Sequence, residues 1–191
     1  MRARVAPSSR APVCGVVLQR ARRRDHGLAM THRIVIMGVS GCGKSSVGEG
    51  LATRLGIPYR DGDDLHPPAN VEKMRAGVPL TDDDRWPWLD RVAGVLATEA
   101  PVIVGCSALR RAYRDRLRAG AGGPVRFIHL IGSRELIAGR MAARTGHYMP
   151  PSLLDSQFAA LDVPGPDEAL AIDIDQPLDA IITAAAEGLI P

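Results

Sequence analysis

The sequence has few cysteines and no long hydrophobic run. Its three cysteines, Cys14, Cys42 and Cys106, show neither the spacing of a disulfide framework nor that of a metal site. They are expected to act as small apolar residues in a reducing compartment, which favours a cytoplasmic location. No segment approaches the roughly 20 consecutive apolar residues that a transmembrane helix requires, so no contact with a membrane is expected.

Lysine and aromatic residues are also scarce. The chain has only two lysines, Lys44 and Lys73, beside 22 arginines, and it has seven aromatic residues. The net charge of +3 is unevenly distributed, because residues 1–29 hold seven arginines and one acid. Subtracting that surplus of six positive charges leaves residues 30–191 with a net charge of −3. A protein that binds nucleic acid through a basic surface would carry a positive net charge there. We therefore expect no nucleic-acid partner outside the basic N-terminal segment.

The Arg-rich segment 1–29 differs in composition from the rest of the chain. It has no periodic apolar pattern, and its one apolar run, Val13 to Leu18, is too short for a signal-peptide core. Three interpretations stay open: an upstream start codon with Met30 as the true start, an Arg-rich transit peptide, or a disordered arm. The first is preferred, because arginine replaces lysine throughout the chain. Residues 30–191 are expected to form one domain, which is long enough to bury a core.

From Met30 on, apolar runs of strand length alternate with segments of helical periodicity. Strands are expected at 33–38, 101–106, 125–132 and 169–174, with a further strand just before the acidic residues that begin at Asp61. Helices are expected at 44–55, 69–76, 85–98, 108–118, 133–143, 152–160 and 177–188. Such alternation predicts an α/β fold in which helices cover both faces of a parallel sheet.

Ligands of open parallel sheets bind beyond the carboxyl ends of the strands. The loops expected to share that crevice are 38–45, 61–66, 105–110 and 175–177. Candidate functional residues are therefore sought in these four loops.

The first of them, GVSGCGKS, matches the phosphate-binding pattern G-x-x-x-x-G-K-[ST] at every fixed position and lies between a strand and a helix. Its glycines allow close approach of the backbone, so that N–H groups and the positive end of the helix surround an anion. Lys44 is expected to reach the β- and γ-phosphates, and the Ser45 hydroxyl to bind Mg²⁺. The pattern predicts that ATP is bound by Gly38, Val39, Ser40, Gly41, Cys42, Gly43, Lys44, Ser45 and Ser46.

Cys42 has two interpretations. A neighbouring helix N-terminus would lower the pKa of its thiol and make it reactive. Otherwise Cys42 is only a small side chain that the loop tolerates, which is the preferred interpretation.

A triphosphate site suits a small-molecule kinase, a GTPase switch or a nucleic-acid ATPase. The base-reading N-K-x-D pattern of GTPases is absent, and no strand ends in the Asp-Glu pair of motor ATPases. The strand at 101–106 ends instead in Cys106 and is followed by Ser107. The carboxylates lie in DGDD, at 61–64, where the predicted fold brings them opposite the phosphate loop. This favours a kinase.

Several blocks of the sequence resemble, in order and spacing, the bacterial-type gluconokinases, a branch of the shikimate-kinase-like P-loop kinases. The blocks are GVSGCGKSSVG, DGDDLHPPANVEKMRAGVPLTDDDRWPWL, CSALRRAYRDRLR, RTGHYM, SQFAALDVP and IDIDQPL. They span about residues 33–188, and the block from Asp61 to Leu89 is far more specific than the phosphate loop. The departures are mild: Cys42 replaces a usual small residue, and Asp162 stands where glutamate is common.

The resemblance implies a parallel five-stranded sheet with helices on both faces, a small helical lid at about 139–152, and a homodimer. It implies that the protein transfers phosphate from ATP to the 6-hydroxyl of D-gluconate. The alternatives are a related kinase that acts on shikimate or adenylylsulfate, and a nucleic-acid-associated NTPase whose basic arm binds RNA or DNA.

The resemblance also implies roles in the acidic loop. Asp63 is expected to contact the substrate hydroxyl, and to position it more than deprotonate it, because the transition state of phosphoryl transfer is loose. Asp61 is expected to orient a Mg²⁺-bound water, and Asp64 to be solvated. His66 either hydrogen-bonds a gluconate hydroxyl or braces the loop.

Arginines are the candidates for the anionic groups. Arg75 and Arg110 are expected to bind the carboxylate and hydroxyls of gluconate, because a guanidinium offers two parallel hydrogen bonds to a carboxylate. Arg75 is alternatively an exposed helix charge. Arg140 and Arg144, four residues apart, are expected to approach the β- and γ-phosphates as the lid closes, the alternative being an ordinary basic helix face.

Two further groups complete the expectations. Gln176 and Pro177 follow the last strand, where related kinases hold adenine by backbone contacts. The residues from Asp82 to Asp84 are expected to be structural, with Asp84 and Arg85 forming a cap and an ion pair just before a helix. The alternative for Arg85 is a contact with the substrate. Trp86 and Trp88 are expected to serve packing.

Overall fold

The computed structural model describes residues 32–143 and 151–190. The segment 1–29 and the middle of the expected lid lie outside these residues. Within them, five parallel strands form one sheet in the order β2-β3-β1-β4-β5, which confirms the expected fold class. The strands are β1 (Arg33–Met37), β2 (Tyr59–Asp61), β3 (Val102–Gly105), β4 (Val125–Ile131) and β5 (Ala169–Asp173).

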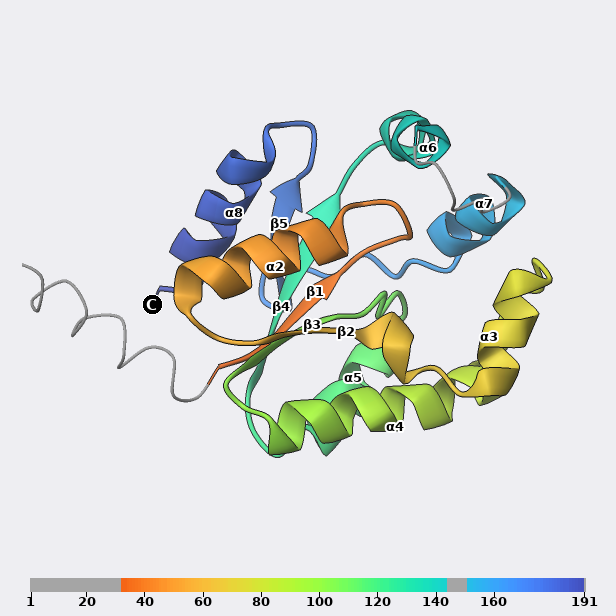
Figure 1. Cartoon of the computed structure of the whole chain (residues 1–191), viewed down its shortest axis with the longest axis horizontal. Coiled ribbons are helices and arrows are strands. Elements are labelled where there is room, and N and C mark those ends of the chain that lie inside the picture. Colours follow the sequence, from red (N-terminus) through yellow and green to blue (C-terminus); the bar gives the residue numbers. More distant parts are fainter. Residues whose placement is uncertain (1–31, 144–150, 191) are drawn as a thin grey trace, which may run out of the picture.

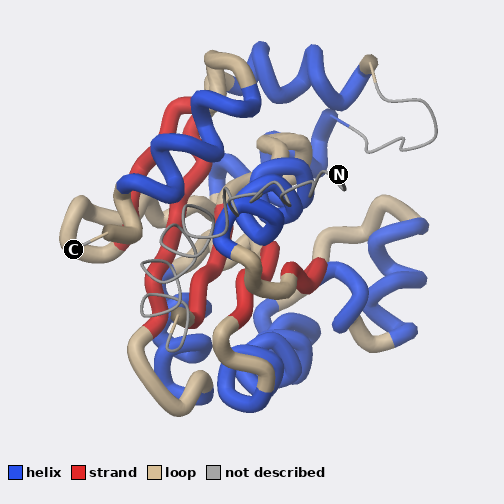
Figure 2. Tube along the Cα trace, turned by 60° about the vertical axis from the view of Figure 1, so that its left-hand side comes forward, coloured by secondary structure: helices blue, strands red, loops and turns tan. Residues whose placement is uncertain are grey.

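Helices cover both faces of this sheet. They are α2 (Lys44–Leu55), the 3-10 turn η1 (Gly62–Leu65), α3 (Pro68–Arg75), α4 (Asp82–Thr98), α5 (Arg111–Gly120), α6 (Arg134–Ala142), α7 (Pro151–Ala159) and α8 (Leu178–Glu187). Figure 1 shows α2 and α8 on one face and α4 and α5 on the other, and Figure 2 shows the strands enclosed between these layers. Helices α3, α6 and α7 gather at the carboxyl ends of the strands, where a ligand is expected. None of the helices in the described part of the chain is long and apolar enough to span a membrane.

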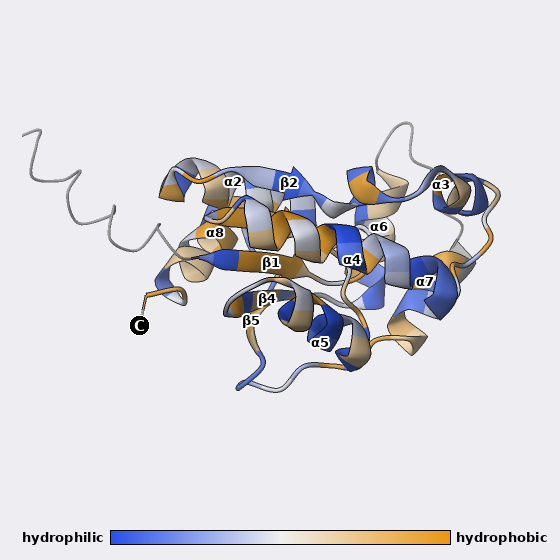
Figure 3. Ribbon diagram, turned by 90° about the horizontal axis from the view of Figure 1, so that it is seen from below, coloured by the Kyte–Doolittle hydropathy of each residue, from blue (hydrophilic) through white to orange (hydrophobic). Residues whose placement is uncertain are grey.

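The central strand β1 shows why the sheet has a core on each side. Ile34 and Ile36 pack in the cluster under α2 and α8, whereas Val35 and Met37 pack in the cluster under α4 and α5. Successive side chains of a strand point to opposite faces, so a strand covered on both sides is apolar throughout. Figure 3 shows this strand as a mostly hydrophobic band through the middle of the molecule. Full burial of each such side chain stabilises the fold by about 1.5–3 kcal/mol.

Helix α4 begins at Asp82, three residues before the predicted start at position 85. The reason is a capping box: the Thr81 hydroxyl accepts a hydrogen bond from the backbone N–H of Asp84 at 3.3 Å, and the Asp84 carboxylate accepts one from the N–H of Thr81 at 2.8 Å. Asp84 therefore lies in the first turn and not before the helix. A further hydrogen bond from Lys73, with those from Thr81, lowers the pKa of Asp84 to about 2.

Helix α5 begins at Arg111, later than the predicted start at position 108, and the extra loop residues remain at the carboxyl end of β3. Ala108 has a left-handed backbone with φ 43°, which prevents the helix from starting there. The buried Arg114 guanidinium holds this loop by donating to the carbonyl oxygens of Ala108 and Leu109 at 3.2 and 3.0 Å. It also pairs with both carboxylate oxygens of Glu168, at 2.8 and 3.0 Å, so one side chain joins the loop, α5 and the residues before β5.

Arg114→Met is expected to lower the free energy of unfolding by about 3 kcal/mol, because it removes the hydrogen bonds to the Ala108 and Leu109 carbonyls and breaks a largely buried ion pair. Urea denaturation measures the change. Arg111→Met is the matched control on the same helix: its side chain is 76% exposed, lies 3.8 Å from Asp115, and should change stability by less than about 0.5 kcal/mol. Equal losses in the two variants would contradict this role of Arg114.

Candidate active site

The phosphate loop lies between β1 and α2, as the sequence pattern predicts. Gly38, Gly41 and Gly43 have φ angles of 140°, 80° and 99°, a region that side chains with a Cβ rarely adopt. Gly43 caps α2 without any side-chain hydrogen bond, so no side chain takes the place of an anion at the start of the helix. The helix macrodipole adds positive potential at the same point.

The Lys44 ammonium lies over this loop. Its Nζ atom donates hydrogen bonds to the carbonyl oxygens of Gly38 and Val39, at 3.2 and 3.1 Å. These two carbonyls hold the cation above the loop whose N–H groups are expected to bind phosphate. A contact of Lys44 with the terminal phosphates of a bound triphosphate stays a prediction.

Ser45 and Asp61 connect the phosphate loop to the acidic loop. The Ser45 hydroxyl donates a hydrogen bond to Asp61 Oδ2 at 2.9 Å, and the Tyr59 hydroxyl lies 3.4 Å from the same oxygen. Burial raises the pKa of Tyr59, so this hydroxyl stays protonated and acts as a donor. Asp61 Oδ1 accepts from the backbone N–H of Asp63 at 3.0 Å, which orients the carboxylate.

The oxygens of Ser45 and Asp61 fit a magnesium ion. Mg²⁺ in kinases takes one or two protein oxygens, phosphate oxygens and several waters. Among the described residues, no group of three or more His, Cys, Asp or Glu side chains gathers to hold a metal alone. A hydroxyl and a carboxylate at the phosphate loop are the donors that such a phosphate-dependent site requires.

The acidic loop is held close to the sheet by two contacts. A Cβ on Gly62 would collide with the carbonyl oxygen of Gly105, so only glycine fits between the two carboxylates of the D-G-D triplet. The Trp88 indole donates a hydrogen bond to the Gly62 carbonyl at 2.7 Å. Asp63 comes next, with a side chain that is 74% exposed, so the loop presents this carboxylate toward solvent at the carboxyl edge of the sheet.

His66 braces the same loop, one of the two roles expected for it. Its ring stacks on Trp88 with the centroids 4.2 Å apart, and its Nδ1 lies 3.3 Å from the Asn70 amide nitrogen. Burial, with a smaller effect of Arg85, lowers the pKa of His66 to about 4, so the ring is neutral at pH 7. Its Nε2 lies 4.0 Å from Asp63 Oδ1. A hydrogen bond from His66 to a sugar hydroxyl stays a prediction.

Two arginines meet at Asp82, in the first turn of α4. Asp82 Oδ2 accepts a hydrogen bond from Arg110 at 2.7 Å, and its Oδ1 accepts one from the Tyr113 hydroxyl. The Arg85 guanidinium lies 3.3 Å from that hydroxyl and 3.8 Å from the carboxylate. This arginine cluster (Arg85, Arg110, Tyr113 and Asp82) already holds a carboxylate between two guanidinium groups.

Arg75 lies apart from that cluster. It is the last residue of α3, its side chain is exposed, and it makes no ion pair within the described residues. The neighbouring Lys73 pairs instead with Asp84 at 2.6 Å. The structure therefore brings Arg110, but not Arg75, into a cluster of charged groups.

A pocket of about 340 Å³ lies next to the phosphate loop, between α2, α6 and the start of α8. The residues that line it are Gly41, Cys42, Gly43, Ser46, Val47, Arg140, Ala143, Gln176, Leu178 and Ile181. Arg140 and Gln176 are among these lining residues, whereas Pro177 caps α8 beside them. Their contacts with the nucleotide stay predictions. The Arg140 guanidinium donates to the Ile174 carbonyl at 2.7 Å, and Arg144 lies outside the described residues.

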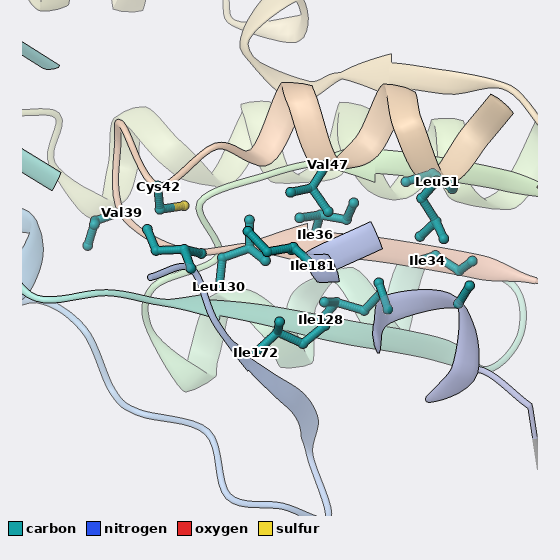
Figure 4. Close-up of a cluster of buried hydrophobic side chains, with 14 of the residues drawn as sticks. Ile34, Ile36, Val39, Cys42, Val47, Leu51, Ile128, Leu130, Ile172 and Ile181 are labelled. Carbon is teal, nitrogen blue, oxygen red and sulfur yellow. The ribbon is translucent and has the colours of Figure 1, made fainter. Parts of the chain in front are cut away.

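The buried position of Cys42 favours its interpretation as a small tolerated residue. The side chain is 1% exposed and lies in the cluster under α2, beside Val39 and Leu130 in Figure 4. Burial raises the pKa of the Cys42 thiol and outweighs the lowering effect of Lys44. The alternative of a thiol activated by the helix N-terminus is therefore wrong, because the sulfur points into the core.

Sequence reasoning missed one residue that touches the phosphate loop. Gln157 of α7 accepts a hydrogen bond from the backbone N–H of Ser40 at 2.7 Å and donates one to the Ser40 hydroxyl at 3.0 Å. It belongs to the block SQFAALDVP, but nothing in a single glutamine 117 residues away indicates a partner.

Comparison with known proteins agrees with this geometry. A family model described as an AAA domain matches residues 34–164. The chain is 52% identical to a gluconokinase of Gluconobacter oxydans over 71% of this chain and 78% of that protein. It is 44% identical to the thermoresistant gluconokinase of Escherichia coli, over 82% of this chain and 92% of that protein.

A solved structure gives the same result. The crystal structure of a gluconokinase from Sinorhizobium meliloti superposes with a TM-score of 0.78 at 52% identity, and the match covers 84% of this chain and 92% of that chain. Identity at this level over most of the chain shows the family. This chain belongs to the gluconokinases, a family of P-loop kinases.

Proposed function

We propose that this protein transfers the γ-phosphoryl group of ATP to the 6-hydroxyl of D-gluconate and so forms 6-phospho-D-gluconate. The observation that carries the proposal is the Ser45–Asp61 hydrogen bond, which fixes an acidic loop beside a phosphate loop in a chain of this family. A nucleotide-binding protein that only hydrolysed or stored ATP would not need carboxylates and arginines at the opposite wall of the crevice. The shikimate and adenylylsulfate alternatives have no comparable support, because the relatives at 44–52% identity are gluconokinases.

The metal site is part of the proposal. Ser45 and Asp61 would hold Mg²⁺, either directly or through a water in the case of Asp61. When bound, the ion neutralises the charge that develops on the phosphate oxygens. The chain itself supplies the rest of the positive field through Lys44 and the start of α2.

Asp63 is the proposed group for the substrate hydroxyl. Its carboxylate is exposed at the end of the rigid acidic loop, and the Asp61 carboxylate accepts its backbone N–H, so the position of the side chain is set by the loop. A carboxylate held in this way accepts the hydrogen of the attacking hydroxyl and aims the oxygen at phosphorus. Neutral His66, whose Nε2 lies 4.0 Å from Asp63 Oδ1, is proposed to form a hydrogen bond with a neighbouring hydroxyl of the substrate.

The carboxylate of gluconate is proposed to bind at the arginine cluster. Arg110 already pairs with one carboxylate, that of Asp82, and Arg85 lies close to the same group. A ligand carboxylate gains two parallel hydrogen bonds when it approaches such guanidinium groups. Arg75 remains a second candidate on the strength of the family resemblance.

The nucleotide is proposed to extend from the phosphate loop into the 340 Å³ pocket, with the adenine near Gln176 and Pro177. Arg140 lines that pocket and is proposed, with Arg144, to add positive charge near the phosphates.

A cytoplasmic location, a homodimer and the absence of a nucleic-acid partner are also proposed. The family resemblance supports the dimer, and the charge of −3 outside the N-terminal segment supports the last point.

The substrate is tested by coupled ATP consumption with gluconate, shikimate, adenylylsulfate and other sugar acids. We expect turnover with gluconate to exceed that with shikimate or adenylylsulfate by at least about 100-fold in kcat/KM, because neither of these acceptors presents a primary hydroxyl at the far end of an open chain from a carboxylate. The Lys44→Ala variant gives the background rate of the assay. Faster turnover with shikimate or adenylylsulfate would overturn the proposal.

Asp63→Asn is expected to lower kcat by about 100-fold or more, because the amide cannot accept the proton or hold the hydroxyl as a carboxylate does. The Kd of ATP, measured by calorimetry, should change little, whereas Lys44→Ala should weaken ATP binding and lower kcat together. Asp64→Asn is the matched control, since Asp64 is the exposed neighbour on the same turn. If Asp64→Asn reduced kcat as much as Asp63→Asn, the assignment of Asp63 would fail.

Arg110→Met is expected to raise the KM for gluconate at least about tenfold, because a charge-assisted hydrogen bond contributes roughly 1.5–3 kcal/mol. Arg110→Lys, which keeps the charge, should have a smaller effect. Arg75→Met measured in parallel decides between its two interpretations: a contact with substrate raises KM, and an exposed helix charge leaves it within about twofold. An unchanged KM in Arg110→Met would place the carboxylate elsewhere.

A further inference from the structure

The Gln157 side chain holds Ser40 at two points. Its Oε1 accepts the backbone N–H of Ser40 at 2.7 Å, and its Nε2 donates to the Ser40 hydroxyl at 3.0 Å. The Gln157 amide therefore binds both a donor and an acceptor of Ser40. Two hydrogen bonds fix the orientation of Ser40 more strictly than one hydrogen bond does. The contact is partly buried and joins α7 to the tip of the phosphate loop.

The peptide group that Gln157 holds is the one that also holds Lys44. The N–H of Ser40 and the carbonyl of Val39 belong to the same planar peptide unit. Gln157 binds the N–H end, and the Lys44 ammonium donates to the carbonyl end at 3.1 Å. The order of contacts is therefore Gln157, the 39–40 peptide and Lys44, and a rotation of that peptide displaces the ammonium.

The helix that carries Gln157 is itself fixed next to the loop. Asp155 of α7 pairs with Arg134 of α6 through two hydrogen bonds, at 2.5 and 3.1 Å. Met141 of α6 lies against the phosphate loop, since a Cβ on Gly41 would be 2.5 Å from its Cγ. Figure 1 shows α6 and α7 together beyond the turn that joins β1 to α2. The amide of Gln157 is thus presented by a helix whose position the loop and α6 both restrict.

We propose that Gln157 is a positioning residue for phosphoryl transfer, which acts on Lys44 through the 39–40 peptide. The proposal rests on the proposed kinase function. Gln157 need not touch the nucleotide. Gln157 orients the 39–40 peptide, and this peptide holds the Lys44 ammonium beside the position proposed for the terminal phosphates. There the charge of Lys44 stabilises the transition state most.

Gln157→Ala is expected to lower kcat with gluconate about tenfold and to leave the KM for gluconate within about twofold, because Lys44 acts on the phosphates and not on the sugar. The Kd of ATP and of ADP, measured by calorimetry, is the second readout. The preference for ATP over ADP should fall about fivefold, since a displaced ammonium loses part of a charge-assisted contact with the γ-phosphate. Ser156→Ala is the matched control: among the described residues its hydroxyl bonds only to the Leu153 carbonyl of the same helix, and both readouts should stay at the wild-type value.

Ser40→Ala separates the two contacts. It removes the hydroxyl but keeps the peptide N–H for Gln157, so kcat should fall by less than it does in Gln157→Ala. The double variant Gln157→Ala/Ser40→Ala should match Gln157→Ala alone, because the hydroxyl has no partner left to lose. Additive losses in the double variant would overturn the proposed route through Ser40.

Three results would overturn the proposal. In the first result, Gln157→Ala keeps both kcat and the preference for ATP over ADP. In the second, it lowers only the thermal midpoint of unfolding, which would mean that the contact serves only stability. In the third, it binds ATP more tightly with kcat unchanged, which would mean that the amide competes with phosphate for the Ser40 N–H. The calorimetric arm needs no sugar, so a wild-type protein that fails to phosphorylate gluconate would refute the proposed function while the inference about Gln157 is still tested.

Discussion

The Ser45–Asp61 hydrogen bond joins the first turn of α2 to the end of β2, and the arrangement of the remaining groups depends on it. Both residues are fixed by the sheet, because β2 pairs with β3 and β3 pairs with β1, which leads directly into the phosphate loop. Gly62 then lies against the Gly105 carbonyl, where no larger residue fits. The acidic loop is consequently held beside the phosphate loop by the Ser45–Asp61 hydrogen bond and by the pairing of β2 in the sheet.

Three cations at the carboxyl ends of the strands already have partners within the protein. Lys44 donates to two carbonyls of its own loop, Arg110 pairs with Asp82, and Lys73 pairs with Asp84. An anionic ligand therefore exchanges one set of hydrogen bonds for another and gains only the difference in free energy. Such an arrangement favours selectivity over affinity, since a ligand that makes fewer contacts than the existing partners does not displace them.

The fold and the phosphate loop were predictable because their signals are local. Apolar runs and helical periodicity located β1, β3, β4, β5 and the helices α2 to α8, and the glycines, Lys44 and Ser45 have a fixed spacing. The short strand β2 has no apolar run, so this pattern did not locate it. Helix starts were less predictable: α4 begins early because Thr81 and Asp84 form a capping box, and α5 begins late because Ala108 adopts a left-handed backbone. Contacts between distant segments could not be predicted. Neither the burial of the Cys42 sulfur nor the pairing of Gln157 with Ser40 follows from any pattern along the chain.

The stacking of His66 on Trp88 has a consequence for spectroscopy. Both tryptophans of the protein, Trp86 and Trp88, lie in the first half of α4, and the buried one donates its indole N–H to the acidic loop. Tryptophan fluorescence of this molecule therefore originates from one wall of the crevice. Movement of the loop that carries Asp61 and Asp63 changes the surroundings of that indole directly, so the protein contains its own optical reporter of the substrate side of the site.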